Sequence, residues 1–122
     1  MAKILIIDDE IPVRVYLRQI LEGVHEVLEA ANGKVGLRLY WEHMPDLVIT
    51  DILMPEKDGV EVIMELVDQA PGVKIIAISG GGRGLDANFN LRVAQDFGAL
   101  RALAKPFTRR EVLDLVNDLL GG

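Results

Sequence analysis

Residues 4–10 read Ile-Leu-Ile-Ile-Asp-Asp-Glu, an apolar run that stops abruptly at three acidic residues. Four branched apolar residues in a row are typical of a β-strand that is covered on both faces, as in a parallel sheet. The run is far too short for a signal peptide. We therefore interpret it as a buried strand whose end delivers Asp8, Asp9 and Glu10 to one edge of a sheet.

Four more strands are predicted further along the chain, with helical patterns between them. With the first, the strand candidates are Ile4–Ile7, Val27–Ala30, Leu47–Thr50, Val73–Ile78 and Leu100–Ala104. The intervening stretches and the C-terminal stretch repeat apolar residues at helical spacing. These stripes comprise Val13, Tyr16, Leu17, Ile20, Leu21 and Val24; Leu37, Tyr40, Trp41 and Met44; Val60, Ile63, Met64 and Val67; Phe89, Val93 and Phe97; and Val112, Leu115, Val116, Leu119 and Leu120. The alternation predicts βαβ units.

The composition of the strands also predicts their order. The second strand neighbours His25, Glu26 and Glu29 and the fifth contains Arg101, whereas the first, third and fourth are more apolar. Polar residues are tolerated at the edges of a sheet. We therefore expect an α/β, flavodoxin-like fold: a doubly wound five-stranded parallel sheet of order 2-1-3-4-5, with five helices on its two faces.

Length, charge and composition limit the domain organisation and the class of partner. The 122 residues suit a single domain, 1–122, with no room for an output domain. The net charge of -6 weakens the case for a nucleic-acid partner. No segment approaches the roughly 18 apolar residues of a membrane span, and the lack of cysteine excludes disulfides and thiolate metal sites. We expect a cytoplasmic protein that binds neither nucleic acid nor membrane.

Polar side chains stand at the ends of four predicted strands. The first strand ends in the acidic triplet, the third in Asp51, the fourth in Ser79 and the fifth in Lys105-Pro106. Because the carboxyl ends of parallel strands meet at one edge, we expect these groups to lie together, where doubly wound proteins bind ligands. Three carboxylates there would repel one another unless protons or a cation neutralised them. Mg²⁺, or Mn²⁺ in its place, suits Asp8, Asp9 and Asp51.

Asp51 is the best candidate nucleophile toward a phosphoryl group because it lies on the central strand. Lys105 would supply a fixed positive charge and Ser79 a hydroxyl donor, since phosphoryl transfer depends mainly on positioning and electrostatic stabilisation. Each residue alone has an ordinary interpretation, as a solvated strand end, a surface lysine or a turn serine. Their joint arrival at successive strand ends favours the functional interpretation.

At these positions the chain resembles the response regulator receiver family of two-component signalling, and in particular its stand-alone, chemotaxis-regulator-like members. The matching residues, in family order, are Ile6–Glu10, Asp51–Pro55, Asp58-Gly59, Ser79 and Lys105–Phe107. The resemblance implies a phosphoacceptor regulator that assists its own phosphorylation and dephosphorylation, and not an enzyme with a separate substrate. Its phosphoryl donor would be a sensor histidine kinase or a histidine phosphotransfer protein, and its output would be binding to an unlinked protein target.

The resemblance also assigns roles to single residues. It implies that Asp51 is the phosphorylation site and that Ser79 and Lys105 contact the phosphoryl group. The main-chain carbonyl of Leu53 would join the three aspartates as a metal ligand. The Lys105-Pro106 peptide would be cis, a form that X–Pro bonds adopt at little cost.

Two departures from the family pattern concern the switch. The family usually has Tyr or Phe three residues before the lysine, where this chain has Ala102. The segment from Ser79 to Lys105 is also a few residues longer than usual and contains a glycine-rich run, Gly80 to Gly84. We expect the phosphoacceptor chemistry to survive, and we hypothesise that phosphorylation orders this loop in place of turning an aromatic ring.

Two other functions are compatible with parts of this sequence. A magnesium-dependent phosphatase or phosphotransferase for small substrates would use the same carboxylates, but the chain lacks a cap domain and has Leu53, not Asp, two residues after Asp51. A flavin mononucleotide module would share the topology. Its phosphate would have to meet the loop after the first strand, where the acidic triplet would repel it.

Overall fold

The computed structural model describes residues 1–52, 54, 59–80 and 87–121. Strands and helices alternate along the described chain. In order they are β1 (Lys3–Ile7), α1 (Ile11–Leu21), β2 (Glu26–Ala30), α2 (Gly33–His43), β3 (Leu47–Asp51), α3 (Gly59–Gln69), β4 (Ile75–Ser79), α4 (Ala87–Asp96), β5 (Arg101–Ala104) and α5 (Arg109–Leu120).

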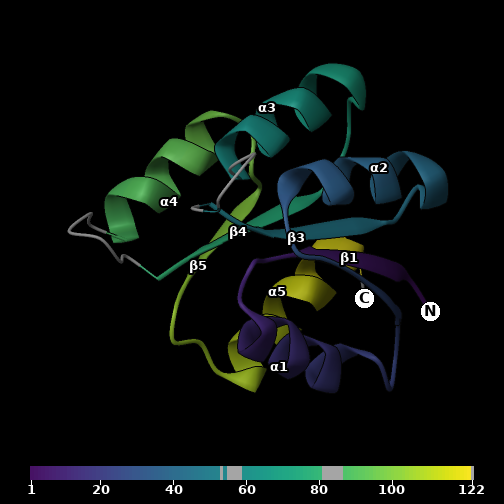
Figure 1. The fold of residues 1–122 in the computed structure, drawn as a ribbon. Coiled ribbons are helices and arrows are strands. Elements are labelled where there is room, and N and C mark those ends of the chain that lie inside the picture. Colours follow the sequence, from purple (N-terminus) through teal and green to yellow (C-terminus); the bar gives the residue numbers. More distant parts are fainter. Residues whose placement is uncertain (53, 55–58, 81–86, 122) are drawn as a thin grey trace.

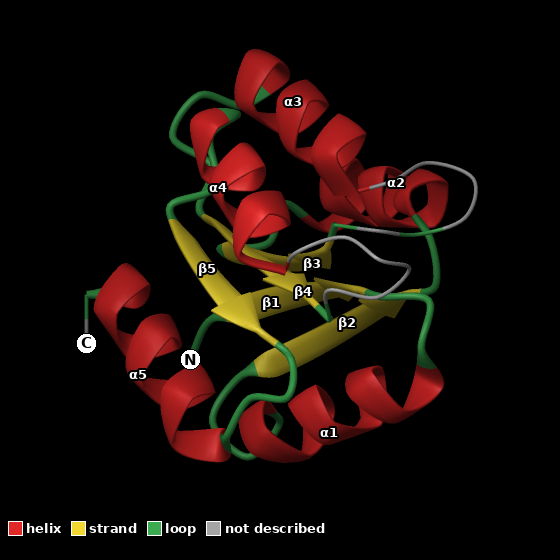
Figure 2. Ribbon diagram, turned by 90° about the vertical axis from the view of Figure 1, so that its left-hand side faces the viewer, coloured by secondary structure: helices red, strands yellow, loops and turns green. Residues whose placement is uncertain are grey.

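The strands form one parallel sheet of order β2-β1-β3-β4-β5, which confirms the predicted fold and both predicted edge strands. Helices α2, α3 and α4 cover one face of the sheet, and α1 and α5 cover the other (Figures 1 and 2). Each face has its own apolar core. In β1, Leu5 and Ile7 belong to the core under α2, α3 and α4, whereas Ile4 and Ile6 belong to the core under α1 and α5.

The predicted helical stripes are less deeply buried than their spacing indicates. A helix on a sheet buries only the stripe that faces the strands, so the outer members of a wide stripe face solvent. Tyr40 is buried as expected. The exposed members are Tyr16 of α1 and Val24, which lies beyond its end, together with Trp41, Met44, Met64, Val67 and Phe97. The fourth strand also begins at Ile75 rather than Val73 and includes Ser79.

The start of α3 lies directly against the backbone of β3. The Gly59 amide donates a hydrogen bond to the Ile52 carbonyl at 2.7 Å. A Cβ at Gly59 would collide with the Asp51 carbonyl oxygen and lie 2.7 Å from Ile52 Cα. Since both obstacles are backbone atoms, which cannot rotate away, only glycine allows α3 to begin this close to Asp51.

Replacing Gly59→Ala should therefore destabilise the protein by about 2 kcal/mol or more, as overpacking against rigid neighbours does. Gly23→Ala is the matched control, because no atom lies within 4 Å of a Cβ placed there, and it should change stability by less than about 0.5 kcal/mol. Urea unfolding of the two variants measures the difference. Equal unfolding midpoints would show that the backbone at residue 59 moves freely.

Candidate functional site

The carboxyl ends of four strands bring the predicted site residues to one edge of the sheet. Asp51 is the last residue of β3 and Ser79 the last of β4. Asp8 follows β1 and continues its ladder, since its amide donates to the Ala30 carbonyl at 3.1 Å. Lys105 follows β5 in the same way, and its amide donates to the Ser79 carbonyl at 2.8 Å. Backbone hydrogen bonds therefore fix the Cα positions of both residues.

Three carboxylates meet at this edge, as the sequence predicted. Asp8, Asp9 and Asp51 offer carboxylate oxygens that lie within 4.8 Å of one another. Asp8 and Asp51 are almost fully buried, with 0% and 4% of their surface exposed, and Asp9 is more open to solvent. Asp8 Oδ1 accepts a hydrogen bond from the Glu10 amide at 2.8 Å. The buried Asp8 Oδ2 accepts no hydrogen bond of good geometry from the described residues, and its close polar contact is the ion pair with Lys105.

Lys105 places its ammonium group among these acids. Its Nζ lies 3.1 Å from Asp8 Oδ2 and 3.5 Å from Asp51 Oδ2. The shortest contact, 2.7 Å, is a hydrogen bond to Glu10 Oε1. The sequence shows Glu10 as part of the acidic triplet but predicts no role for it. The signal that could have assigned one is its position directly after the two candidate metal ligands, at the same strand end.

Burial and charge shift the proton affinities of these groups. Burial, reinforced by the charges of Asp8 and Asp9 and opposed by Lys105, raises the pKa of Asp51 to about 7. Burial likewise raises the pKa of Asp8. Burial would lower the pKa of Lys105, but its hydrogen bond to Glu10 and the charges of Asp51 and Asp8 outweigh burial and raise that pKa. Lys105 therefore stays protonated at neutral pH.

Comparison with known proteins identifies the family. Residues 4–117 match the response regulator receiver domain family. The chain belongs to that family. The receiver is 37% identical to the chemotaxis protein CheY of Halobacterium salinarum, with 98% of each chain covered. It is 34% identical to sporulation initiation phosphotransferase F of Bacillus subtilis, with 97% of this chain and 93% of that one covered.

Solved structures agree with the sequence relatives. A response regulator receiver domain protein from Clostridium thermocellum has a TM-score of 0.90 and 32% identity to this receiver, with 99% of this chain and 95% of that one covered. The protein is thus a CheY-like phosphoacceptor regulator of two-component signalling, and the small-substrate phosphatase is not favoured. Within the described residues, no helix is both long and apolar enough to cross a membrane.

A second set of charged side chains, further from Asp51, supports the main chain of Asp8. The Arg14 guanidinium donates from Nη1 to the Asp8 carbonyl at 2.6 Å. Its Nε lies 3.2 Å from Glu29 Oε1. The other oxygen of Glu29 pairs with Arg18 Nε at 2.5 Å. Glu29 on the edge strand β2 therefore fixes two arginines of α1, one of which orients the backbone of an acidic site residue.

Several further predictions concern the neighbours of the site. The Lys105-Pro106 peptide is cis, as expected. Ala102 is partly buried on β5, where it pairs with Ala77 and packs against the core under α2, α3 and α4. Leu53, whose carbonyl was expected to bind metal, and residues 81–86 of the glycine-rich segment lie outside the described residues. The ligand role and the loop-ordering hypothesis therefore stay predictions.

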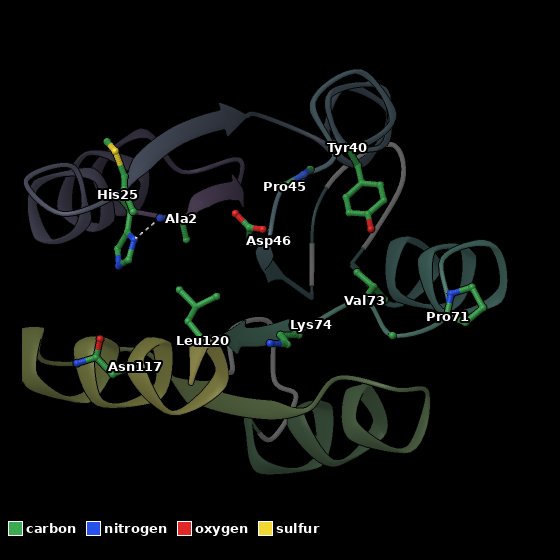
Figure 3. Close-up of a pocket in the computed structure, with 12 residues that line it drawn as sticks. Ala2, His25, Tyr40, Pro45, Asp46, Pro71, Val73, Lys74, Asn117 and Leu120 are labelled. Atoms are coloured by element: carbon green, nitrogen blue, oxygen red, sulfur yellow. Dashed lines mark hydrogen bonds between the residues drawn. The ribbon is translucent and has the colours of Figure 1, made fainter. Parts of the chain in front are cut away.

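A second pocket lies at the opposite end of the sheet, where the strands begin. A pocket of about 630 Å³ there includes His25, Asp46 and Lys74 in its lining (Figure 3). Each of these side chains bonds to backbone: His25 accepts from the Ala2 amide at 3.1 Å, Asp46 accepts from the Lys3 amide at 2.8 Å, and Lys74 donates to the Leu119 carbonyl at 2.8 Å. These contacts tie the terminal segments of the receiver to its sheet.

The raised pKa of Asp51 predicts a pH dependence for the metal-free receiver. Asp51 binds its proton more tightly in the folded state than in the unfolded chain, so its contribution to stability is complete below pH 3.8 and is lost as pH rises to about 7. Asp51→Asn, which cannot ionise, should gain stability over the parent protein across this window, by a few kcal/mol at most, since one pKa unit corresponds to about 1.4 kcal/mol.

Urea unfolding with EDTA at several pH values between 4 and 8 tests this expectation. Asp114→Asn, an exposed carboxylate of α5 whose side chain is 71% accessible, is the matched control and should follow the parent curve. A stability difference between Asp51→Asn and the parent protein that stays constant across the pH range would contradict a raised pKa at Asp51.

Proposed function

We propose that Asp51 accepts a phosphoryl group from a phosphohistidine partner. A carboxylate oxygen of Asp51 forms the new bond to phosphorus as the bond from phosphorus to the histidine nitrogen breaks. The observation that carries the proposal is the position of Asp51: a buried carboxylate at the end of the central strand, beside two more carboxylates and 3.5 Å from the Lys105 ammonium. A nucleophile requires the ionised form, so neutralisation of its acidic neighbours favours the reaction.

Receiver domains bind Mg²⁺ in an acidic pocket, and the donor set here fits such an ion. Asp8, Asp9 and Asp51 provide hard oxygen ligands within 4.8 Å of one another. The buried Asp8 Oδ2 has no hydrogen bond of good geometry from the described residues and is paired with the Lys105 ammonium at 3.1 Å, so its environment already favours a positive charge. We infer that these three side chains and the Leu53 carbonyl hold Mg²⁺, with Mn²⁺ as a substitute. The bound cation would neutralise the carboxylates and the phosphoryl oxygens.

Lys105 and Ser79 act on the transferred group in this proposal. Because Lys105 remains protonated, its ammonium can stabilise the negative charge on the phosphoryl oxygens. It must then exchange its hydrogen bond to Glu10 for one to a phosphoryl oxygen. Ser79, fully buried at the end of the strand next to Asp51, would donate its hydroxyl hydrogen. The same groups would assist dephosphorylation by orienting the acyl phosphate toward water.

The partners of the receiver follow from its class. Receiver domains of this type work with histidine kinases and phosphotransfer proteins. For this chain we infer a donor of that kind and an unlinked protein target that recognises the phosphorylated form. The net charge of -6 argues against nucleic acid as that target. The stand-alone organisation of residues 1–122 stays a prediction.

Acetyl phosphate labelling tests the phosphoacceptor assignment. The parent receiver should gain the mass of one phosphoryl group in the presence of Mg²⁺ and none with EDTA. Asp51→Asn should not be labelled, and the control Asp114→Asn should be labelled like the parent protein. Mass spectrometry of the intact proteins gives the stoichiometry. Full labelling of Asp51→Asn at another residue would remove Asp51 from the mechanism.

The metal site predicts a separate effect on stability. Mg²⁺ should raise the melting temperature of the parent receiver, because a ligand that binds only the native state stabilises it. Asp9→Asn should raise the stability of the metal-free protein by relieving repulsion. It should also weaken Mg²⁺ binding by roughly 10-fold or more, since even outer partners of metal ligands contribute that much.

Thermal unfolding across a Mg²⁺ titration measures both effects in one experiment. Asp114→Asn again serves as the control that changes the same formal charge away from the site. If Asp9→Asn binds Mg²⁺ as tightly as the parent protein, Asp9 is not a ligand.

A further inference from the structure

A groove outside the acidic site runs along the outer surface of α3. Its volume is about 650 Å³, and its lining includes Glu61, Met64, Glu65, Val67 and Asp68 of α3 and Phe97 directly after α4. Helices α3 and α4 lie side by side on the same face of the sheet (Figures 1 and 2). The core-facing residues of α3 are Gly59, Val62, Ile63 and Leu66. The groove therefore uses side chains of α3 that the fold leaves outside its core.

Three large apolar side chains of this groove face solvent. The exposed fractions are 47% for Met64, 37% for Val67 and 44% for Phe97. Single exposed apolar residues are ordinary on protein surfaces, but a group of them in one concave site is typical of an interface. The helical spacing of Met64 and Val67 predicted burial, and the sheet does not provide it. A partner that covers the groove would.

The backbone around Phe97 is fixed before any partner binds. Its amide donates to the Val93 carbonyl at 3.1 Å, and the next amide, of Gly98, donates to the Gln95 carbonyl at 3.1 Å. Gly98 has a φ of 126°, and a Cβ there would lie 2.5 Å from Val67 Cγ2. Only glycine lets the turn approach α3 this closely. The aromatic ring is thus presented beside α3 by a rigid turn, which lowers the entropy lost on binding.

The charge of the groove selects the partner. Glu61, Glu65 and Asp68 follow one another at helical spacing beside the apolar residues. Asp68 also lies in the last turn of α3, which contains no basic residue, at the negative end of the helix dipole. No Lys or Arg is found among the described residues that line the groove. A second copy of the receiver in a two-fold symmetric contact would bring like charges together.

We propose that this groove binds an amphipathic helix of a partner protein, with an apolar stripe flanked by Lys or Arg residues. The apolar stripe would pack on Met64, Val67 and Phe97, and the negative charge along this side of α3, with Asp68 at its end, would attract the basic residues. This docking surface is distinct from the acidic site. The proposal does not require phosphorylation of Asp51.

A synthetic helical peptide of about 15 residues tests the proposal, with leucines at i, i+3, i+4 and i+7 and lysines on its other face. Amide NMR titration of the unphosphorylated receiver should show saturable shifts in α3 and at Phe97 and Gly98. Phe97→Ser and Met64→Ser should each weaken binding about ten-fold. Asp68→Asn should weaken it several-fold and reduce its salt dependence. Val24→Ser, which changes a side chain that is 61% exposed elsewhere, should have no effect.

Three results would overturn the proposal. One is equal affinity for a control peptide with glutamates in place of the lysines. Another is unchanged affinity in both Phe97→Ser and Met64→Ser, whose folding is checked by their unfolding curves. The third is a concentration-dependent dimer of the receiver, seen by sedimentation, that buries the groove without any peptide.

Discussion

The contact between Lys105 and the carboxylates of Asp8 and Asp51 is the interaction on which the acidic site depends. Two buried acids and a third nearby would destabilise any fold that forced them together without a compensating charge. The ammonium at 3.1 Å from one and 3.5 Å from the other supplies part of that compensation. The remainder is left to protons or to a cation. Site and fold are therefore linked, because Lys105, which we propose binds a phosphoryl oxygen, also makes the folded state tolerable.

The parallel sheet creates this linkage. Its three inner strands, β1, β3 and β4, are buried on both faces, so their register is fixed by two apolar cores. Asp51 and Ser79 each end a strand, and the amides of Asp8 and Lys105 continue the ladder one residue beyond a strand. The first residue of α3, Gly59, packs against the backbone at Asp51 and further restricts the position of that backbone. The Cα atoms of Asp8 and Asp51 therefore cannot separate unless the sheet itself changes.

Much of this arrangement could be predicted from the sequence, because the relevant patterns are local. Short apolar runs with acidic, hydroxyl or lysine ends predicted the strands, their order and the meeting of Asp8, Asp9, Asp51, Ser79 and Lys105. Contacts between side chains that are far apart in the sequence have no local pattern and could not be predicted in this way. The hydrogen bond between Glu10 and Lys105 joins residues 95 positions apart. The exposure of Met64 and Val67 also escaped prediction, since helical spacing defines a stripe but not how much of it the sheet covers.

The pairing of Glu29 with Arg14 and Arg18 extends the site to the margin of the fold. Glu29 lies on the edge strand β2, which contributes no side chain to the acidic cluster. Through Arg14 it nevertheless supports the carbonyl of Asp8. A comparison that ranked substitutions by distance from Asp51 would class Glu29 among the surface positions free to vary. Its ion pairs instead make the edge strand β2 part of the scaffold that orients the backbone of Asp8. Related receivers that differ at Glu29 would therefore be expected to differ at Arg14 and Arg18 as well.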